Sequence, residues 1–312
     1  MNLEVDVGGL RLKNPVIAAS GTFGYGVEVA DITDLSRLGG IVTKGLYLEA
    51  RDGCPTPRVA ETPSGLLNAI GLQGVGVKAF VRDVLPELAR HDTAVIVNVC
   101  GDTVREYAEV SAILDAAEGV SALEINISCP NVERGGLQFG IDARMTHEVV
   151  AEVRKATRLP VIPKLSPNVT DITVFARAAE EAGADALSCV NTLLGLAVDV
   201  KTRRPKLAFG TGGLSGPAIR PVALRLAWQA AQAVSIPVIG IGGITETQDA
   251  LEFLVAGCRA IQVGTANFVD PATGAGIAAG LATYLEREGL DSIGAVIGTL
   301  QMPNREPTPA SR

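Results

Sequence analysis

The strongest constraint on the fold is a regular alternation of short apolar runs with longer amphipathic or alanine-rich stretches. Each run is bounded by turn residues, which is typical of a strand buried on both faces of a parallel sheet. Eight such runs predict an α/β fold, a (β/α)₈ TIM barrel, whereas an open doubly wound sheet rarely needs so many regular strands. The predicted strands are 16–19, 41–43, 94–97, 122–125, 161–163, 186–190, 238–241 and 260–263, and the predicted helices are 77–89, 103–117, 143–156, 172–182, 218–233 and 246–256.

The beginning and the end of the chain depart from this alternation. Residues 3–13 alternate in polarity and turn at Gly8 and Gly9, so they predict a short N-terminal β-hairpin. The end of the chain is proline-containing and polar. We therefore predict one barrel domain over residues 1–300 and a C-terminal tail over 301–312.

Two connections are much longer than the others. They span residues 45–76 after the second predicted strand and 191–217 after the sixth, and both are rich in glycine, proline and polar residues. In a barrel, loops that follow the strands lie on the face that contains the active site. We expect long loops there that act as lids or as substrate walls.

The composition is acidic and poor in aromatic residues. Asp and Glu number 34 against 27 Lys and Arg, for a net charge of −7, which argues against general affinity for nucleic acid. The sequence has no basic and apolar leader at its start and no apolar run of the roughly 18 residues that a membrane helix needs. We expect a soluble, cytoplasmic protein with no membrane contact.

Cysteine and histidine usage excludes several kinds of site. The closest two of the five cysteines, Cys100 and Cys129, are 29 positions apart, so no pair has the spacing of a zinc or iron–sulfur ligand set, and we expect no metal on this chain. The two histidines, His91 and His147, fall before the third predicted strand and within a predicted helix. Neither is expected in the barrel mouth, so serine-triad and histidine–metal chemistry lack their usual groups.

The predicted strands end in polar residues or glycine. In a barrel, the C-terminal ends of the strands form the active site. Lys44 and Lys164 follow the second and fifth strands, while Asn98, Asn126 and Asn191 follow the third, fourth and sixth. A lysine that points into a barrel mouth needs an anionic partner to offset its desolvation. These residues predict a small, polar, anionic ligand.

Glycine clusters gather in the last third of the chain, at 212–216, 242–243 and 263–265. Loops after strands seven and eight commonly bind phosphate through bare backbone N–H groups. The Rossmann and P-loop motifs are both absent from the sequence. The clusters therefore predict a phosphate-bearing ligand held by barrel loops.

The segment 126–131 combines two asparagines, a serine, a cysteine and a proline directly after the fourth predicted strand. Taken alone, it fits an ordinary turn with a buried cysteine as well as it fits a reactive site. Because no histidine is available, Cys129 is the candidate proton-transfer group, and nearby lysine charge would favour its thiolate. Glu124, within the same strand, is interpreted as an inward-facing structural polar residue.

Four segments resemble the dihydroorotate dehydrogenase family, and the similarity runs over about residues 3–300. They are 64–73, 126–131, 163–168 and 212–217. The cysteine within 126–131 is typical of class 1, the cytosolic branch, and 64–73 and 212–217 look more like type 1B, whose catalytic chain pairs with an electron-transfer subunit.

The resemblance implies two sets of ligands and no metal. One FMN per chain would be held by Ser20, Gly21, Lys44, Gly45, Asn98, Asn126, Lys164, Val190, Gly216, Gly242, Gly243, Gly264 and Thr265. The pyrimidine, dihydroorotate or orotate, would be held by Lys44, Asn68, Ala69, Ile70, Gly71, Leu72, Asn126, Asn131, Asn191 and Thr192.

The resemblance also implies a reaction, an oxidation of (S)-dihydroorotate to orotate in de novo pyrimidine (UMP) biosynthesis. Cys129 would remove the C5 proton while hydride leaves C6 for FMN, and Lys164 would lie where the reduced flavin gathers negative charge. Type 1B implies a homodimer that joins a partner subunit carrying FAD and [2Fe-2S] in a heterotetramer, with NAD⁺ as the final acceptor.

Three alternatives stay open at this point. Type 1A is a homodimer that passes electrons to fumarate. A flavin barrel reductase of the dihydrouridine synthase kind also uses a loop cysteine, but it binds tRNA, which the acidic composition disfavours. A barrel that binds a phosphate ligand without turnover would leave Cys129 and the lysines without a role.

Overall fold

The computed structural model describes residues 1–127 and 140–303. Within them, eight parallel strands close into a barrel in the order β10-β15-β16-β3-β4-β7-β8-β9, so the predicted barrel is confirmed. Every predicted strand is present, with its ends shifted by at most two residues. The barrel strands are β3 (Val16–Ala18), β4 (Gly40–Val42), β7 (Ala94–Val99), β8 (Ala122–Asn126), β9 (Val161–Leu165), β10 (Leu187–Cys189), β15 (Val238–Ile241) and β16 (Ala260–Val263).

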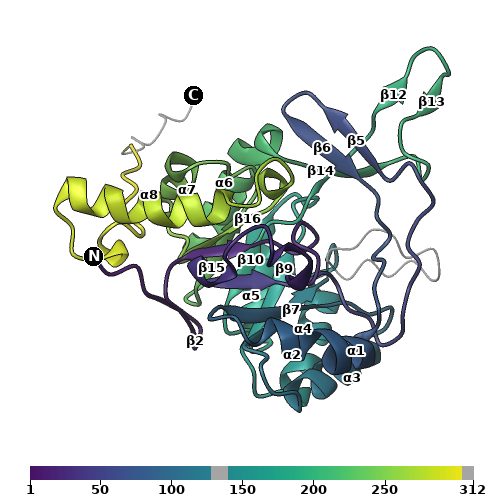
Figure 1. Ribbon diagram of the computed structural model, residues 1–312, viewed down its shortest axis with the longest axis horizontal. Helices are drawn as coiled ribbons and strands as arrows, with labels where there is room; N and C mark the ends of the chain where they lie inside the picture. The colour runs from purple at the N-terminus through teal and green to yellow at the C-terminus, as the bar shows by residue number, and fades with distance from the viewer. Residues whose placement is uncertain (128–139, 304–312) are drawn as a thin grey trace, which may run out of the picture.

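Helices surround the barrel and bury their apolar faces against it (Figure 1). Three of the predicted helices begin at a side chain that accepts from the first turn, Thr103, Asp142 and Asp171, as helix N-caps commonly do. Over residues 77–89, where the sequence predicts one helix, the structure has a helix whose middle segment is π-helical. The helices are α1 (Val77–Ala79), η3 (Phe80–Val84), α2 (Leu85–Leu88), α3 (Val104–Asp115), α4 (Ala143–Ala156), α5 (Ile172–Glu181), α6 (Arg220–Ala233), α7 (Thr247–Val255) and α8 (Thr273–Glu288).

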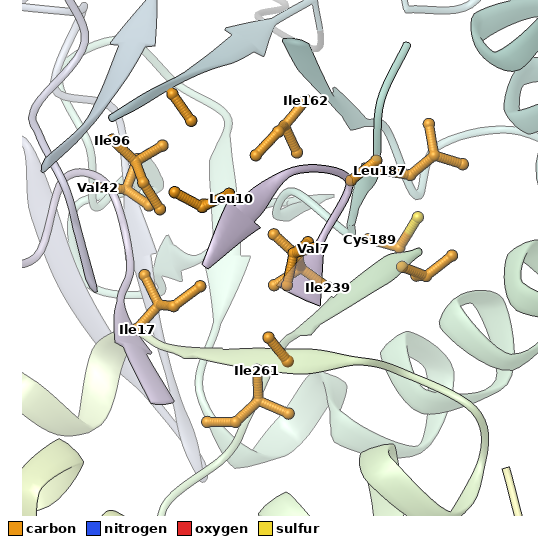
Figure 2. Packing of buried hydrophobic residues seen from close by; sticks show 14 of the residues in the cluster. Val7, Leu10, Ile17, Val42, Ile96, Ile162, Leu187, Cys189, Ile239 and Ile261 are labelled. Atoms are coloured by element: carbon orange, nitrogen blue, oxygen red, sulfur yellow. The ribbon is translucent and has the colours of Figure 1, made fainter. Parts of the chain in front are cut away.

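The N-terminal hairpin is confirmed and closes one end of the barrel. β1 (Val5–Val7) pairs with β2 (Leu10–Leu12), and Figure 2 shows Val7 and Leu10 among the isoleucines of the barrel strands. At the turn, a Cβ on Gly8 would lie 2.1 Å from the Asp185 carbonyl oxygen, so only glycine fits there. Asp185 precedes β10, which places the hairpin at the N-terminal rim.

The long connections after β4 and β10 are present, and parts of each form short strands. They pair with each other in an antiparallel sheet of order β11-β14-β6-β5, which projects from the barrel together with a small hairpin (Figure 1). Each connection forms its own antiparallel pair, β5 with β6 and β11 with β14, and β6 then pairs with β14 to join them. The strands are β5 (Val59–Thr62), β6 (Gly65–Asn68), β11 (Leu193–Gly195) and β14 (Gly212–Ser215), with β12 (Val198–Asp199) and β13 (Arg204–Pro205) in the hairpin.

Two further expectations concern membrane helices and the C-terminal tail. Among residues 1–127 and 140–303, no helix has the length and apolar character needed to cross a membrane. The division into a barrel over 1–300 and a tail over 301–312 stays a prediction, and residues 304–312 lie outside the part of the chain that the structure describes.

Candidate active site

A cavity of about 540 Å³ opens at the C-terminal ends of the barrel strands. Residues that follow the strands form its floor and lower walls, and the antiparallel sheet contributes Leu66, Asn68, Gly213 and Ser215 to its upper wall. Its size falls within the range of about 300–1,000 Å³ typical of small-molecule sites. The two long connections therefore build a wall, as expected of them, although as paired strands.

The structure brings almost all of the predicted cofactor residues to this one cavity, although their roles stay predictions. The exception is Asn98, which is fully buried and lies below the lining. Those that line the cavity are Ser20, Gly21, Lys44, Gly45, Asn126, Lys164, Val190, Gly216, Gly242, Gly243, Gly264 and Thr265.

Most of the residues predicted for the pyrimidine line the same cavity. Ala69 does not, because it is buried in a small cluster with Leu67 and Leu207 behind the wall. Asn131 and the predicted base, Cys129, lie outside the described residues. The residues that line the cavity are Lys44, Asn68, Ile70, Gly71, Leu72, Asn126, Asn191 and Thr192.

Three amide side chains run from the cavity into the barrel interior. Asn191 donates from Nδ2 to Asn126 Oδ1 at 3.3 Å, and Asn126 donates in turn to Asn98 Oδ1 at 3.3 Å. Asn98 then donates to Glu124 Oε1 at 2.7 Å. Tyr107 of α3 fixes the end of β8, because its hydroxyl donates to the Asn126 carbonyl at 2.7 Å. The amides at the cavity floor are thus oriented by buried partners.

Lys164 reaches the floor from β9 and is only 6% exposed. Its Nζ lies 3.3 Å from Oε1 of Glu124, a carboxylate with no exposed surface. Ser188 and Gln262 also donate to Glu124, to Oε2 at 2.9 and 2.6 Å. Glu124 therefore points inward, as expected. It forms an ion pair with Lys164, and both of its carboxylate oxygens accept hydrogen bonds.

A glycine cradle forms part of the cavity wall, after β15 and before α6. Gly216, Gly242 and Gly243 have φ values of 89°, 134° and 73°, in the region that favours glycine. A Cβ on Gly242 would lie 2.5 Å from the Cβ of Ala223. The cradle stands at the start of α6, where Arg220 pairs with Asp249, and such helix starts attract anions. These residues fit the phosphate group of a mononucleotide.

Lys44 lies on the cavity wall beside Asn68 and Leu72. Burial lowers the pKa of Lys44 from its ordinary value, and the positive charge of Arg58 lowers it further, while Glu28 acts in the opposite direction. An anion placed against Lys44 would offset both costs. The cavity thus combines two cationic groups with a glycine cradle suited to phosphate.

The sequence did not reveal every residue that shapes the cavity. Asn168, in a segment that resembles the family, donates to the Thr192 carbonyl at 3.1 Å and accepts from the Leu194 amide at 2.9 Å. It thereby ties the loop after β9 to the sheet wall. Its pairing could not be read from the sequence because the partners lie more than twenty positions away. Within residues 1–127 and 140–303, no group of His, Cys, Asp or Glu could hold a metal ion.

Comparisons with known proteins show the family of the chain. The family model described as dihydroorotate dehydrogenase matches residues 2–285. The chain is 56% identical over 299 residues to a Geotalea uraniireducens protein, covering 96% of this chain and 98% of that one. It is 52% identical over 301 residues to a Bacteroides thetaiotaomicron protein, covering 96% and 99%. Both are named dihydroorotate dehydrogenase B (NAD(+)), catalytic subunit. The chain therefore belongs to the dihydroorotate dehydrogenase family.

Proposed function

We propose that the protein is the catalytic subunit of an NAD⁺-linked dihydroorotate dehydrogenase, which oxidises (S)-dihydroorotate to orotate in pyrimidine biosynthesis. The observation that carries this proposal is that one cavity brings together the glycine cradle, Lys44, Lys164 and a set of oriented amides. The names of relatives that match nearly the whole chain support it.

FMN fits the cavity by size and by donor set. Gly216, Gly242 and Gly243 would hold its phosphate at the start of α6, and Lys164 and Asn126 would lie against the ring system. When bound there, FMN supplies a two-electron acceptor for the hydride that leaves C6 of the substrate. A fixed cation at Lys164 stabilises negative charge without reorganisation during the reaction.

The residues of the chain bind and deprotonate the substrate. Lys44 and the amides of Asn68 and Asn191 would bind the carboxylate and the pyrimidine edge, and the hydrogen bond from Asn191 to Asn126 fixes their relative orientation. Cys129 would take the C5 proton. Its assignment rests on the sequence, because it lies outside the described residues.

The partner assembly completes the proposal. The printed names of the relatives include "catalytic subunit", which supports a second subunit here. We assign FAD and [2Fe-2S] to that subunit, two copies of each chain to a heterotetramer, and the reaction to the cytoplasm. These assignments follow the type 1B resemblance.

Anaerobic addition of dihydroorotate to the FMN-loaded protein tests the proposal. The flavin absorbance should bleach with dihydroorotate and not with dihydrouracil, which lacks the carboxylate that Lys44 would bind. Equal bleaching by both compounds would contradict the substrate assignment. A purified protein that fails to bind FMN would contradict the cofactor assignment.

A further inference from the structure

The carboxylate of Glu124 lies inside the barrel, below the cavity. Glu124 belongs to β8 and Gln262 to β16, and these strands are four places apart in the closed order of eight. They therefore form opposite walls, yet Gln262 Nε2 lies 2.6 Å from Glu124 Oε2. Glu124 thus reaches across the interior, directly beneath the residues of the cavity floor.

The environment of Glu124 fits an ionised carboxylate. Oε1 accepts from Asn98 and Lys164, and Oε2 accepts from Ser188 and Gln262. An ionised carboxylate is an acceptor only, and four donors fill its lone-pair positions. Bulk solvent does not reach the carboxylate, because Glu124 is 0% exposed. It pairs with Lys164, which lines the cavity.

We propose that Glu124 is a positioning residue that orients Lys164 at the cavity floor and Asn98 beneath it, that it offsets the charge of Lys164, and that it thereby sets the reduction potential of the flavin. The inference rests on the proposed function, because it requires FMN above Lys164. A lone buried cation would stabilise the reduced, negatively charged ring strongly. A carboxylate 3.3 Å from that cation cancels part of its field. Glu124 therefore keeps the bound flavin a weaker oxidant than Lys164 alone would make it.

Glu124→Gln separates charge from geometry at this position. The amide oxygen can keep the bonds from Asn98 and Lys164. The new NH₂ group needs acceptors, and Ser188 can accept through its hydroxyl. Gln262 can rotate its amide to present Oε1, which among the described side chains is one of two buried polar atoms without a hydrogen-bond partner. The variant therefore removes one negative charge while each polar atom at position 124 keeps a partner, and Nε2 of Gln262 takes the position that has none.

The expected result is a shift in the flavin equilibrium with little change in FMN binding. Glu124→Gln should raise the equilibrium constant for reduction of bound FMN by roughly tenfold or more, which corresponds to a midpoint potential about 30 mV more positive for a two-electron couple. Dye equilibration measures the potential, and fluorescence quenching measures the FMN dissociation constant. A purely structural role would weaken FMN binding and leave the potential in place.

Asp185→Asn is the matched control. Asp185 also pairs with a cation, Arg154 at 2.6 Å, and accepts from the Val161 amide at 2.7 Å. It lies at the N-terminal rim of the barrel, beside Gly8. Loss of its charge should leave the flavin potential unchanged, because the control carboxylate is at the far end from the cavity.

A second pair of variants keeps the inference testable if Glu124→Gln does not fold. Lys164→Gln leaves the Glu124 charge unpaired, and the double variant with Glu124→Gln removes both charges. The double variant should have the more positive potential of the two and the higher melting temperature, since an unpaired buried charge is costly. Equal potentials within this pair, or a wild-type potential in Glu124→Gln, would overturn the inference. If wild type still bleaches with dihydroorotate, the proposed function stands.

Discussion

At the scale of single residues, Cys129 most directly tests the proposed chemistry. Cys129→Ala should leave a folded, yellow protein whose reduction by dihydroorotate is slower by about 10²–10⁴-fold, the usual contribution of a general base. Cys129→Ser should keep more activity, because its hydroxyl preserves the shape but is a poorer base near neutral pH. Rapid mixing of enzyme and substrate measures the rate of flavin bleaching.

Cys258→Ala is the control for this series. Burial raises the pKa of Cys258 to about 12, so its thiol stays protonated and cannot act as a base at neutral pH. The variant should reduce flavin at close to the wild-type rate. A wild-type rate in Cys129→Ala would show that the base is another group.

Lys44 is expected to bind the substrate carboxylate. Lys44→Ala should weaken orotate binding by about 10–100-fold, the range for loss of a charged hydrogen bond, and Lys164→Ala should mainly weaken FMN binding or slow its reduction. Titration of orotate, followed by the flavin absorbance, separates the two variants. Lys13→Ala, which breaks the pair with Asp92 far from the cavity lining, should change neither. Unchanged orotate affinity in Lys44→Ala would remove Lys44 from the substrate site.

The lowered pKa of Lys44 also predicts a pH dependence. The protonated amine attracts orotate, so affinity should be full below the pKa of Lys44 and fall as the pH rises through it. Because burial, followed by Arg58, lowers that pKa from 10.5, the fall should begin at a lower pH than for an exposed lysine. Lys44→Arg should keep its charge and lose this alkaline fall. An identical profile in Lys44→Arg would assign the titration to another group.

The residue scale also shows what the sequence could and could not predict. The lysines, asparagines and glycines that follow the strands could be placed together, because all parallel strands of a barrel end at the same face. The partners of Glu124 could not be predicted. Ser188 and Gln262 lie 64 and 138 positions away, and the closure of the barrel alone brings them together.

At the scale of elements, the antiparallel sheet above the cavity is held by a small core separate from that of the barrel. That core contains Leu67, Ala69 and Leu207. Leu67→Ala should cost about 2–5 kcal/mol of local packing, and its effect should fall on the sheet wall. We expect a higher KM for dihydroorotate with FMN binding retained, measured by steady-state kinetics and by amide exchange over β6 and β14.

Val200→Ala is a suitable comparison, since Val200 is 84% exposed and lies beyond the edge of that sheet. It should leave KM and amide exchange unchanged. Equal effects of the two substitutions would mean that the sheet wall does not contribute to substrate binding.

The elements also differ in how far sequence patterns predicted them. The barrel strands were predictable because continuous apolar runs mark strands buried on both faces. β5, β6, β11 and β14 were not, because they are short and partly exposed, and the pairing of β6 with β14 joins segments about 145 positions apart. α8 was not predicted either, since half of its buried stripe is glycine and alanine.

At the scale of the whole molecule, the open question is where electrons leave. The sequence has neither a Rossmann fingerprint for NAD⁺ nor a cysteine spacing for a cluster, and its relatives are named as catalytic subunits of an NAD(+) enzyme. We predict that the chain expressed alone oxidises dihydroorotate with artificial dyes but forms no NADH, and that NADH formation requires a second subunit. Parallel assays with a dye, NAD⁺ and fumarate measure this, with the dye reaction as the control for a competent site. Efficient fumarate reduction by the chain alone would assign it to type 1A, because an electron-transfer subunit would then be unnecessary, while its place in the family would stand.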